Sequence, residues 1–91
     1  MTSHKKHFYV YTLFSLKDKR FYTGFTTNLR SRLSQHARGE VKSTTNRRPL
    51  KLIHYDYFIN KEDGKAREIF LKSGYGRNQL KQALKHTLNI P

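Results

Sequence analysis

The chain has 91 residues, no cysteine and a formal net charge of +13, from 19 lysines and arginines against six carboxylates. A chain of this length makes one domain, expected to span residues 1–91, and without cysteine it is neither a disulfide-stapled scaffold nor a thiolate metal site. No run approaches the roughly 18 apolar residues of a membrane span, so we expect a soluble, cytoplasmic protein without membrane insertion. The charge exceeds the magnitude of about 2 to 8 that solubility needs, which indicates a polyanionic partner: DNA, RNA or an anionic membrane surface.

Two aromatic and β-branched runs follow the basic segment 1–7, which we expect to be a mobile N-terminus. Phe8 to Phe14 predicts a buried strand, and Arg20 to Thr26 predicts its hairpin partner across a polar turn. Gly24 inside the second strand indicates a close approach of another group to the backbone.

The middle of the chain predicts a helix, a basic loop and a third strand. The helix is expected from Leu29 to about Arg38, with Thr27 or Asn28 as its N-cap and Gly39 at its end. The loop covers residues 40–49, and the strand covers residues 50–58.

The remaining residues predict two more helices. Asn60 caps one that starts at Lys61 and stops at Gly74, and another is expected from Asn78 to about Leu88. This order predicts an α/β fold of the α+β type, with a three-stranded, largely antiparallel sheet and about three flanking helices.

Helical and strand periodicity bring several polar residues toward one place. At about 100° per residue, Arg32 and His36 border the apolar stripe of the first helix and face the sheet, while Arg30 and Arg38 face outward. If the faces of the first two strands that carry Tyr11 and Tyr22 coincide, the two tyrosines meet Arg32 and His36. The same pattern also fits half-buried core tyrosines and an arginine whose head reaches solvent past two leucines.

The sequence disfavours two common kinds of hydrolase. The neighbouring carboxylates Glu62 and Asp63 point apart on a helix, so no pair is placed to hold two metal ions. The five histidines show no close-spaced zinc motif.

Several ordered blocks resemble the GIY-YIG nuclease superfamily, in particular the small stand-alone bacterial proteins similar to the nuclease domain of the excision-repair incision subunit. Tyr9-Val10-Tyr11 stands at the GIY position, Tyr22-Thr23-Gly24 at the YIG position, and residues 27–36 resemble the following helix. Residues 43–56 and 66–77 resemble later blocks. Tyr9 replaces a glycine and Thr23 an isoleucine, and neither change removes a catalytic group.

The resemblance implies a metal-dependent DNA endonuclease that uses one divalent cation, Mg²⁺ or Mn²⁺. Glu68 matches the family's metal-binding glutamate, Tyr11 would be the general base, and Arg32 would neutralise charge on the phosphorus, with Tyr22 and His36 orienting water or phosphate. A tyrosine base at neutral pH requires a pKa below its usual value near 10, which nearby positive charge favours. Asn78 is matched to a late functional asparagine of some members.

Two further expectations concern Glu68 and the grip on substrate. The alternative for Glu68 is a surface ion pair with Lys72 at i,i+4, and helical periodicity sets it off the expected stripe of Ala66, Ile69 and Phe70. Phosphate contacts are expected from a set of basic and amide side chains, with Lys81 as a further candidate: Arg30, Arg38, Lys42, Asn46, Arg47, Arg48, Lys51 and Arg77.

Two other function classes compete with the nuclease. One is a GIY-YIG-like nucleic-acid-binding module with weak or no turnover, and the other is a small basic protein associated with RNA or ribosomes. The expected substrate is DNA with little sequence preference, and single-stranded, branched or damaged forms are all compatible with the sequence. The protein is expected to be a monomer or a weak homodimer.

Overall fold

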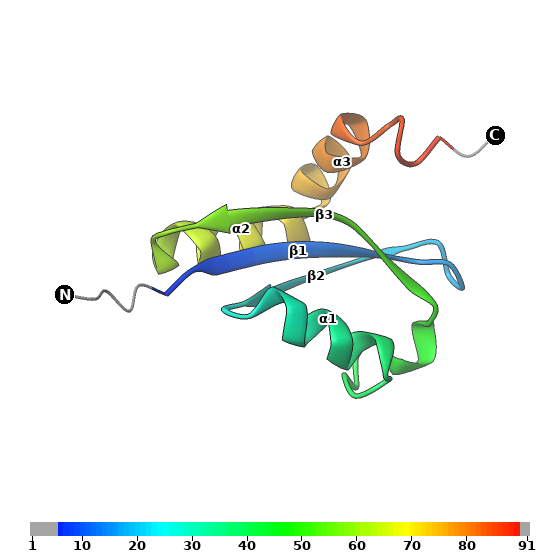
Figure 1. The fold of residues 1–91 in the computed structure, drawn as a ribbon. Helices are drawn as coiled ribbons and strands as arrows, with labels where there is room; N and C mark the ends of the chain where they lie inside the picture. The colour runs from blue at the N-terminus through cyan, green and yellow to red at the C-terminus, as the bar shows by residue number, and fades with distance from the viewer. Residues whose placement is uncertain (1–5, 90–91) are drawn as a thin grey trace.

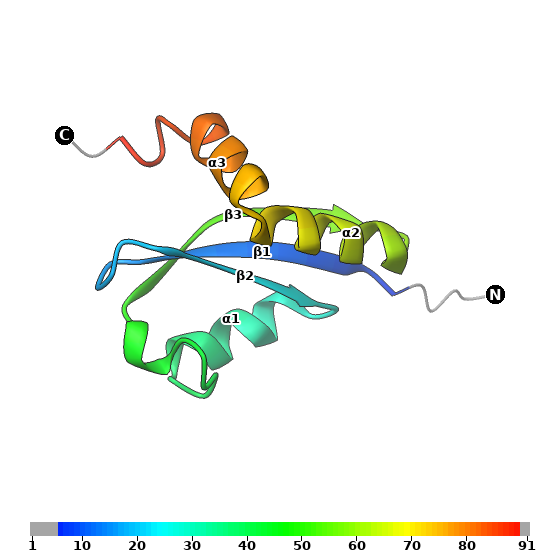
Figure 2. The ribbon, with the colours of Figure 1, turned by 180° about the vertical axis from the view of Figure 1, so that it is seen from behind.

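A computed structural model describes residues 6–89 and confirms the α+β fold (Figures 1 and 2). The three strands β1 (Phe8–Ser15), β2 (Phe21–Thr26) and β3 (Leu50–Phe58) form one antiparallel sheet in the order β2-β1-β3. Most of the basic segment 1–7 lies outside the described residues. No helix among residues 6–89 is long and apolar enough to cross a membrane.

Three helices and a short 3-10 turn complete the fold: α1 (Leu29–Ala37), η1 (Thr45–Arg47), α2 (Lys61–Lys72) and α3 (Gly74–Ala83). The Asn28 side chain caps α1 by accepting from the Ser31 backbone, and Gly39 follows the helix with a φ of 78°. The Asn60 side chain accepts from two backbone amides at the start of α2. The two asparagine caps therefore fix where these helices begin.

The predicted bounds of the last helix are wrong. α2 ends at Lys72, just before the predicted stop at Gly74, but α3 already begins at Gly74 instead of Asn78 and ends at Ala83, well before Leu88. Ser73 makes the turn, because its hydroxyl donates to the Phe70 carbonyl and accepts from the Gly76 amide. A side chain on Gly76 would lie against the Phe70 carbonyl, so α3 can start this close to α2 only with glycine there.

The core lies between the sheet and the pair α2 and α3. Val10, Leu71 and Leu80 are buried at its centre, with half-buried phenylalanines from β2, β3 and α2 around them. The stripe predicted for α2 is right only for Phe70, which packs against the core; Ala66 is exposed and Ile69 is 71% exposed, and Gly64 and Leu71 are the buried positions. Gly64 lets α2 approach closely, since a Cβ there would lie 2.9 Å from the Phe25 ring.

The opposite face of the sheet is only partly covered. Tyr9, Tyr11 and Leu13 point to this face of β1, and α1 lies along its β2 side, away from β3 (Figures 1 and 2). This arrangement places the inner side of α1 against Tyr11.

Candidate active site

Tyr11 occupies the middle of β1 and is fully buried. It pairs directly with Gly24 of β2, and its ring lies over that glycine. A Cβ on Gly24 would come within 2.4 Å of both Cζ and Oη of Tyr11. Gly24 is therefore needed for space, as the sequence predicted, and it sets where the Tyr11 hydroxyl points.

His36 of α1 binds this hydroxyl. Its Nε2 lies 2.7 Å from the Tyr11 Oη, and its Nδ1 lies 2.7 Å from the hydroxyl oxygen of Thr44. The Thr44 hydroxyl in turn donates to the Val41 carbonyl at 3.5 Å. We assign the His36 proton to Nδ1, because Thr44 has one hydrogen to donate; Nε2 then accepts the hydrogen of Tyr11.

Burial controls the charge of both side chains. It lowers the pKa of His36 from 6.5 to about 4, with Arg32 acting in the same direction, so the imidazole is neutral at neutral pH. Burial also raises the pKa of Tyr11, and Arg32 opposes that rise without cancelling it. The expected lowering of the Tyr11 pKa is therefore wrong for the free protein, because desolvation outweighs the nearby positive charge.

Tyr22 and Arg32 complete the side of the site formed by β2 and α1. The Tyr22 ring lies 5.2 Å from the His36 ring and 6.4 Å from the Tyr11 ring, between centroids. Arg32 is half-buried, and its Nη1 donates to the Gln35 side chain at 3.0 Å. Its charge acts on both Tyr11 and His36. The predicted convergence of Tyr11, Tyr22, Arg32 and His36 is what the fold produces.

Glu68 approaches from α2. Its side chain is only 14% exposed and pairs with Lys72 at 2.9 Å and Lys65 at 3.5 Å. The Lys65 ammonium also lies 4.3 Å from the centre of the Phe25 ring, which places this side of α2 beside β2. Of the charges that influence the raised pKa of Tyr11, that of Glu68 has the weakest effect, so Glu68 acts on the site from a distance. The alternative predicted for Glu68, an ion pair with Lys72, is present, and a metal-binding role stays a prediction.

Glu68 is the donor group that a hard cation would use at this site. Among residues 6–89, no group of three or more histidine and carboxylate side chains is arranged to hold a metal ion. Glu68 offers a single carboxylate, and Mg²⁺ commonly binds one or two carboxylates while substrate phosphate and water complete its shell. Two lysine ammonium groups now neutralise that carboxylate, so a cation would have to replace at least one of them.

Most of the residues predicted to grip substrate are exposed: Arg30, Arg38, Lys42, Asn46, Arg48, Lys51 and Arg77. Several of the arginines also bind the protein itself: Arg38 pairs with Glu40, Arg47 pairs with Asp18 at 2.6 Å, and Arg77 donates to the Lys72 carbonyl. Their contact with DNA stays a prediction.

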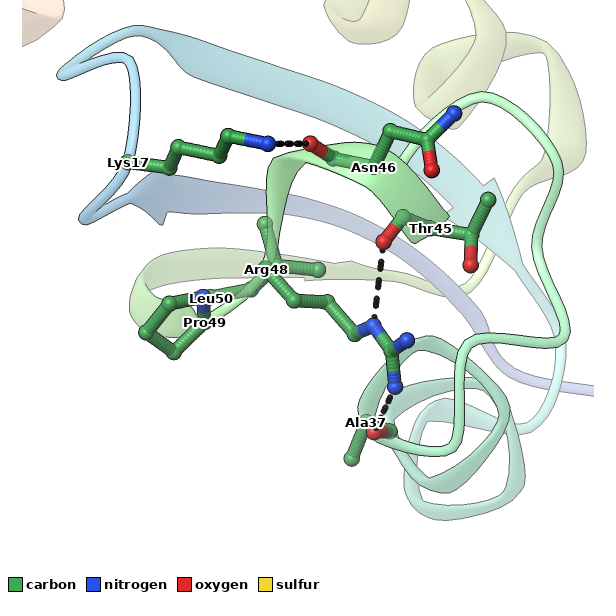
Figure 3. A pocket seen from close by; sticks show the side chains of 7 residues that line it. All are labelled: Lys17, Ala37, Thr45, Asn46, Arg48, Pro49 and Leu50. Carbon is green, nitrogen blue, oxygen red and sulfur yellow. Dashed lines mark hydrogen bonds between the residues drawn. The ribbon is translucent and has the colours of Figure 1, made fainter.

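Arg48 closes the loop before β3 (Figure 3). Its guanidinium donates to the carbonyls of Thr45 and Ala37, at the wall of a pocket of about 550 Å³. The chain bends here through a cis Arg48–Pro49 peptide bond. Arg48 thus ties the end of α1 to the loop that carries Thr44.

A second hollow, of about 670 Å³, lies between the β1–β2 turn and α3. Arg47, Arg77 and Lys81, all predicted phosphate contacts, line it together with Lys19 and Arg20. Asn78 is exposed on α3, and its role stays a prediction.

Sequence reasoning gave no role to Thr44 or Gln35. Thr44 is fully buried in the loop after α1, and Gln35 holds the Arg32 guanidinium. Thr44 lies inside the block of residues 43–56 that carries the resemblance, but no periodicity exists in that loop to place a side chain.

Comparison with known proteins agrees with this geometry. The family model described as the GIY-YIG catalytic domain matches residues 7–81. A UPF0213 protein of Clostridium perfringens is 40% identical over 77 residues, covering 84% of this chain and 81% of that protein. A UPF0213 protein of Pediococcus acidilactici is 36% identical over 77 residues, covering 81% of this chain and 78% of that protein. The solution NMR structure of a UPF0213 protein from Bacillus halodurans is similar, with a TM-score of 0.55, 35% identity and coverage of 85% and 84%.

Proposed function

This chain belongs to the GIY-YIG family, whose matched region is a catalytic domain, and we propose that it is a metal-dependent endonuclease that hydrolyses DNA phosphodiester bonds. The observation that carries the proposal is the meeting of Tyr11 and His36 beside Arg32. We further propose that residues 1–91 act as one cytoplasmic domain. The net charge of +13 attracts the polyanionic substrate.

Tyr11 is the proposed general base, and His36 makes this role feasible despite the raised pKa of the phenol. Tyr11 takes a proton from the attacking water while its own proton passes to Nε2 of His36, so no free phenolate accumulates. The hydroxide attacks phosphorus as the bond to the 3′ oxygen breaks; the leaving 3′ oxygen takes a proton from solvent water, and His36 afterwards releases its extra proton to solvent. A bound phosphodiester carries negative charge, which favours the protonated imidazole that this transfer produces.

The other side chains stabilise charge and position groups. Arg32, held by Gln35, donates to the phosphoryl oxygens as negative charge builds up on them. Thr44 keeps the His36 ring oriented with Nε2 toward Tyr11. Glu68 would hold the cation, Mg²⁺ or Mn²⁺, which when bound supplies positive charge for the leaving oxygen. The basic residues predicted to contact phosphates position the DNA without reading its sequence.

One observation favours a second candidate, a nucleic-acid-binding module with weak or no turnover. Lys65 and Lys72 neutralise Glu68, so a cation must compete with two ammonium groups for the one carboxylate. In this alternative the two ion pairs persist when nucleic acid binds, and the basic surface alone is used.

Cleavage of labelled single-stranded, duplex and branched DNA, with and without Mg²⁺ or Mn²⁺, tests the proposal. We expect metal-dependent nicking that Tyr11→Phe and Glu68→Gln abolish while DNA binding persists. Glu62→Gln is the matched control, because Glu62 is an exposed carboxylate on the same helix. Tight binding without cutting at any metal concentration would favour the binding module, and wild-type turnover in Tyr11→Phe would remove Tyr11 from the chemistry.

A further inference from the structure

A row of aromatic rings covers the part of the sheet that α1 leaves open. We call it the aromatic surface and define it by His7, Tyr9, Tyr55 and Tyr57. The Tyr9 ring lies 5.7 Å from the Tyr57 ring and 6.1 Å from the Tyr55 ring, between centroids. The His7 ring stacks on the Tyr57 ring with 5.2 Å between centroids. Nδ1 of His7 and the hydroxyl of Tyr57 are hydrogen-bonded at 2.7 Å. The rings therefore form a continuous patch.

Strand register puts this patch on the same face as Tyr11. Tyr9 pairs directly with Tyr57 and Tyr11 with Tyr55, and paired residues share a face in an antiparallel sheet. In Figure 1 no helix lies in front of β1 and β3, whereas Figure 2, from behind, shows α2 in front of them. Tyr55 and Tyr57 remain 49% and 48% exposed. The aromatic surface thus borders the catalytic tyrosine and is open to solvent.

Among residues 6–89, no carboxylate lies among the rings of the aromatic surface. The β3 carboxylate, Asp56, points to the other face, where Arg67 of α2 binds it at 2.7 Å. Asp18 and Glu40 are paired with arginines at the far loops. The other three carboxylates belong to α2, which covers the other face, and Glu68, the one of them whose charge influences Tyr11, is paired with Lys65 and Lys72. An anionic ligand with flat apolar groups therefore meets rings but no like charge here.

We propose that the aromatic surface is a binding site for unpaired nucleobases, which stack on Tyr55 and Tyr57 while the attached backbone enters the site at Tyr11. Aromatic side chains beside a positively charged groove are the usual means of holding single strands. Bases in a duplex are stacked on one another, so only unpaired bases offer their faces. A second copy of the chain is the poorer occupant, because each copy carries a charge of +13 and the two would repel.

This proposal rests on the proposed function only in its claim that the DNA backbone attached to the stacked bases enters the site at Tyr11. Its test is a binding measurement without catalysis, so the two can fail separately. Fluorescence anisotropy of a labelled oligonucleotide in EDTA compares three ligands: a single strand, the matching duplex, and a single strand of abasic residues that keeps the phosphates and lacks the bases.

Removal of both exposed rings in the double variant Tyr55→Ala, Tyr57→Ala should weaken single-strand binding by at least about tenfold, from the measured worth of base stacking on aromatic side chains. Duplex and abasic binding should stay within twofold of the wild type, as should the salt dependence, because the phosphate contacts remain. Tyr55→Phe with Tyr57→Phe keeps the rings and should bind as the wild type does. Tyr75→Ala is the matched control, since Tyr75 is 72% exposed on α3, outside the aromatic surface.

A second measurement uses the unaltered chain and does not depend on whether the alanine variant folds. A single strand carrying 5-iododeoxyuridine, irradiated on the wild-type protein, should crosslink to Tyr55 or Tyr57. Crosslinks confined to other residues would overturn the proposal, as would an equal loss of duplex, abasic and single-strand binding in the alanine variant. The proposal would also be overturned if the alanine variant kept its single-strand binding and instead lost binding to lipid vesicles or lost self-association. The first result would assign the surface to a membrane, and the second to another copy of the chain.

Discussion

Gly24 offers the sharpest test of how the site is built. The substitution Gly24→Ala adds a methyl group 2.4 Å from Cζ and Oη of Tyr11. Non-bonded carbon atoms prefer a separation of about 3.5 to 4.0 Å, so the ring has to move by roughly 1 Å. The φ of Gly24 is not in the left-handed region, unlike that of Gly39, so alanine fits the backbone itself. The perturbation therefore acts on the Tyr11 ring.

The displaced ring affects both stability and rate. Its hydroxyl now lies 2.7 Å from His36 Nε2, and a shift of this size breaks that buried hydrogen bond. Crowding a packed interior costs about 1 to 3 kcal/mol, and an unsatisfied buried acceptor costs about 1 to 3 kcal/mol. We expect a total of about 2 to 4 kcal/mol, since the two effects overlap. A catalytic group misplaced by about 1 Å loses roughly 100-fold in rate.

The assay pairs urea unfolding with cleavage of labelled DNA at a temperature where each variant is folded. Leu80→Ala is the control: Leu80 is buried in the core on the other face of the sheet, on α3, away from both Tyr11 and Glu68. It should change stability and leave the cleavage rate of the folded protein near wild type. A Gly24→Ala variant with wild-type turnover, or equal loss of rate in both variants, would refute the steric argument.

Three further predictions concern His36, Thr44 and Ser73. Burial lowers the pKa of His36 from 6.5 to about 4, so as pH falls the unfolded chain takes up a proton on this imidazole before the folded chain does. The free energy of unfolding should therefore fall by about 3 kcal/mol between pH 6.5 and about pH 4, at 1.36 kcal/mol per pKa unit. Urea midpoints measured against pH should show this decline, and a His36→Gln variant that declines equally would contradict it. Thr44→Val leaves Nδ1 of His36 unpaired; we expect a loss of about 1 to 3 kcal/mol and slower cleavage, both restored by Thr44→Ser, and no rescue by serine would exclude the hydroxyl as the cause. Ser73→Ala removes the bond that caps α3 and should cost about 1 kcal/mol in thermal unfolding without changing cleavage; a loss of cleavage in the folded protein would show that α3 acts on the site.

The half of the site that lies on β1, β2 and α1 follows from local patterns. Alternation along two short strands places Tyr11 and Gly24 on one face, and helical periodicity turns His36 toward them. Each of these inferences uses a repeat shorter than four residues, and Asn28 and Gly39 mark the helix ends by their own backbone chemistry. Tertiary structure then only confirms which faces meet.

The other half depends on contacts that no local pattern records. α2 turns Gly64 to the sheet because Phe25 and Phe58 fill that space, and this rotation buries Glu68 and exposes Ile69, against the apolar periodicity. Thr44 lies in a loop whose path is set by Arg48 bonding to the end of α1. The pKa of Tyr11 depends on burial, which a count of nearby charges misses.

Most of the six carboxylates are paired with basic side chains. Four of them are engaged with basic side chains: Asp18 with Arg47, Glu40 with Arg38, Asp56 with Arg67, and Glu68 with two lysines. Each pair fixes a basic group to a loop or to the face behind the sheet. Of these four, only Glu68 acts on Tyr11, and its neutralising groups are flexible lysines, which a cation displaces more readily than an arginine that makes paired hydrogen bonds. If Glu68 holds the cation, as we propose, the ion binds the one carboxylate whose charge is felt by the buried Tyr11, and the neutral His36 beside Tyr11 can receive its proton.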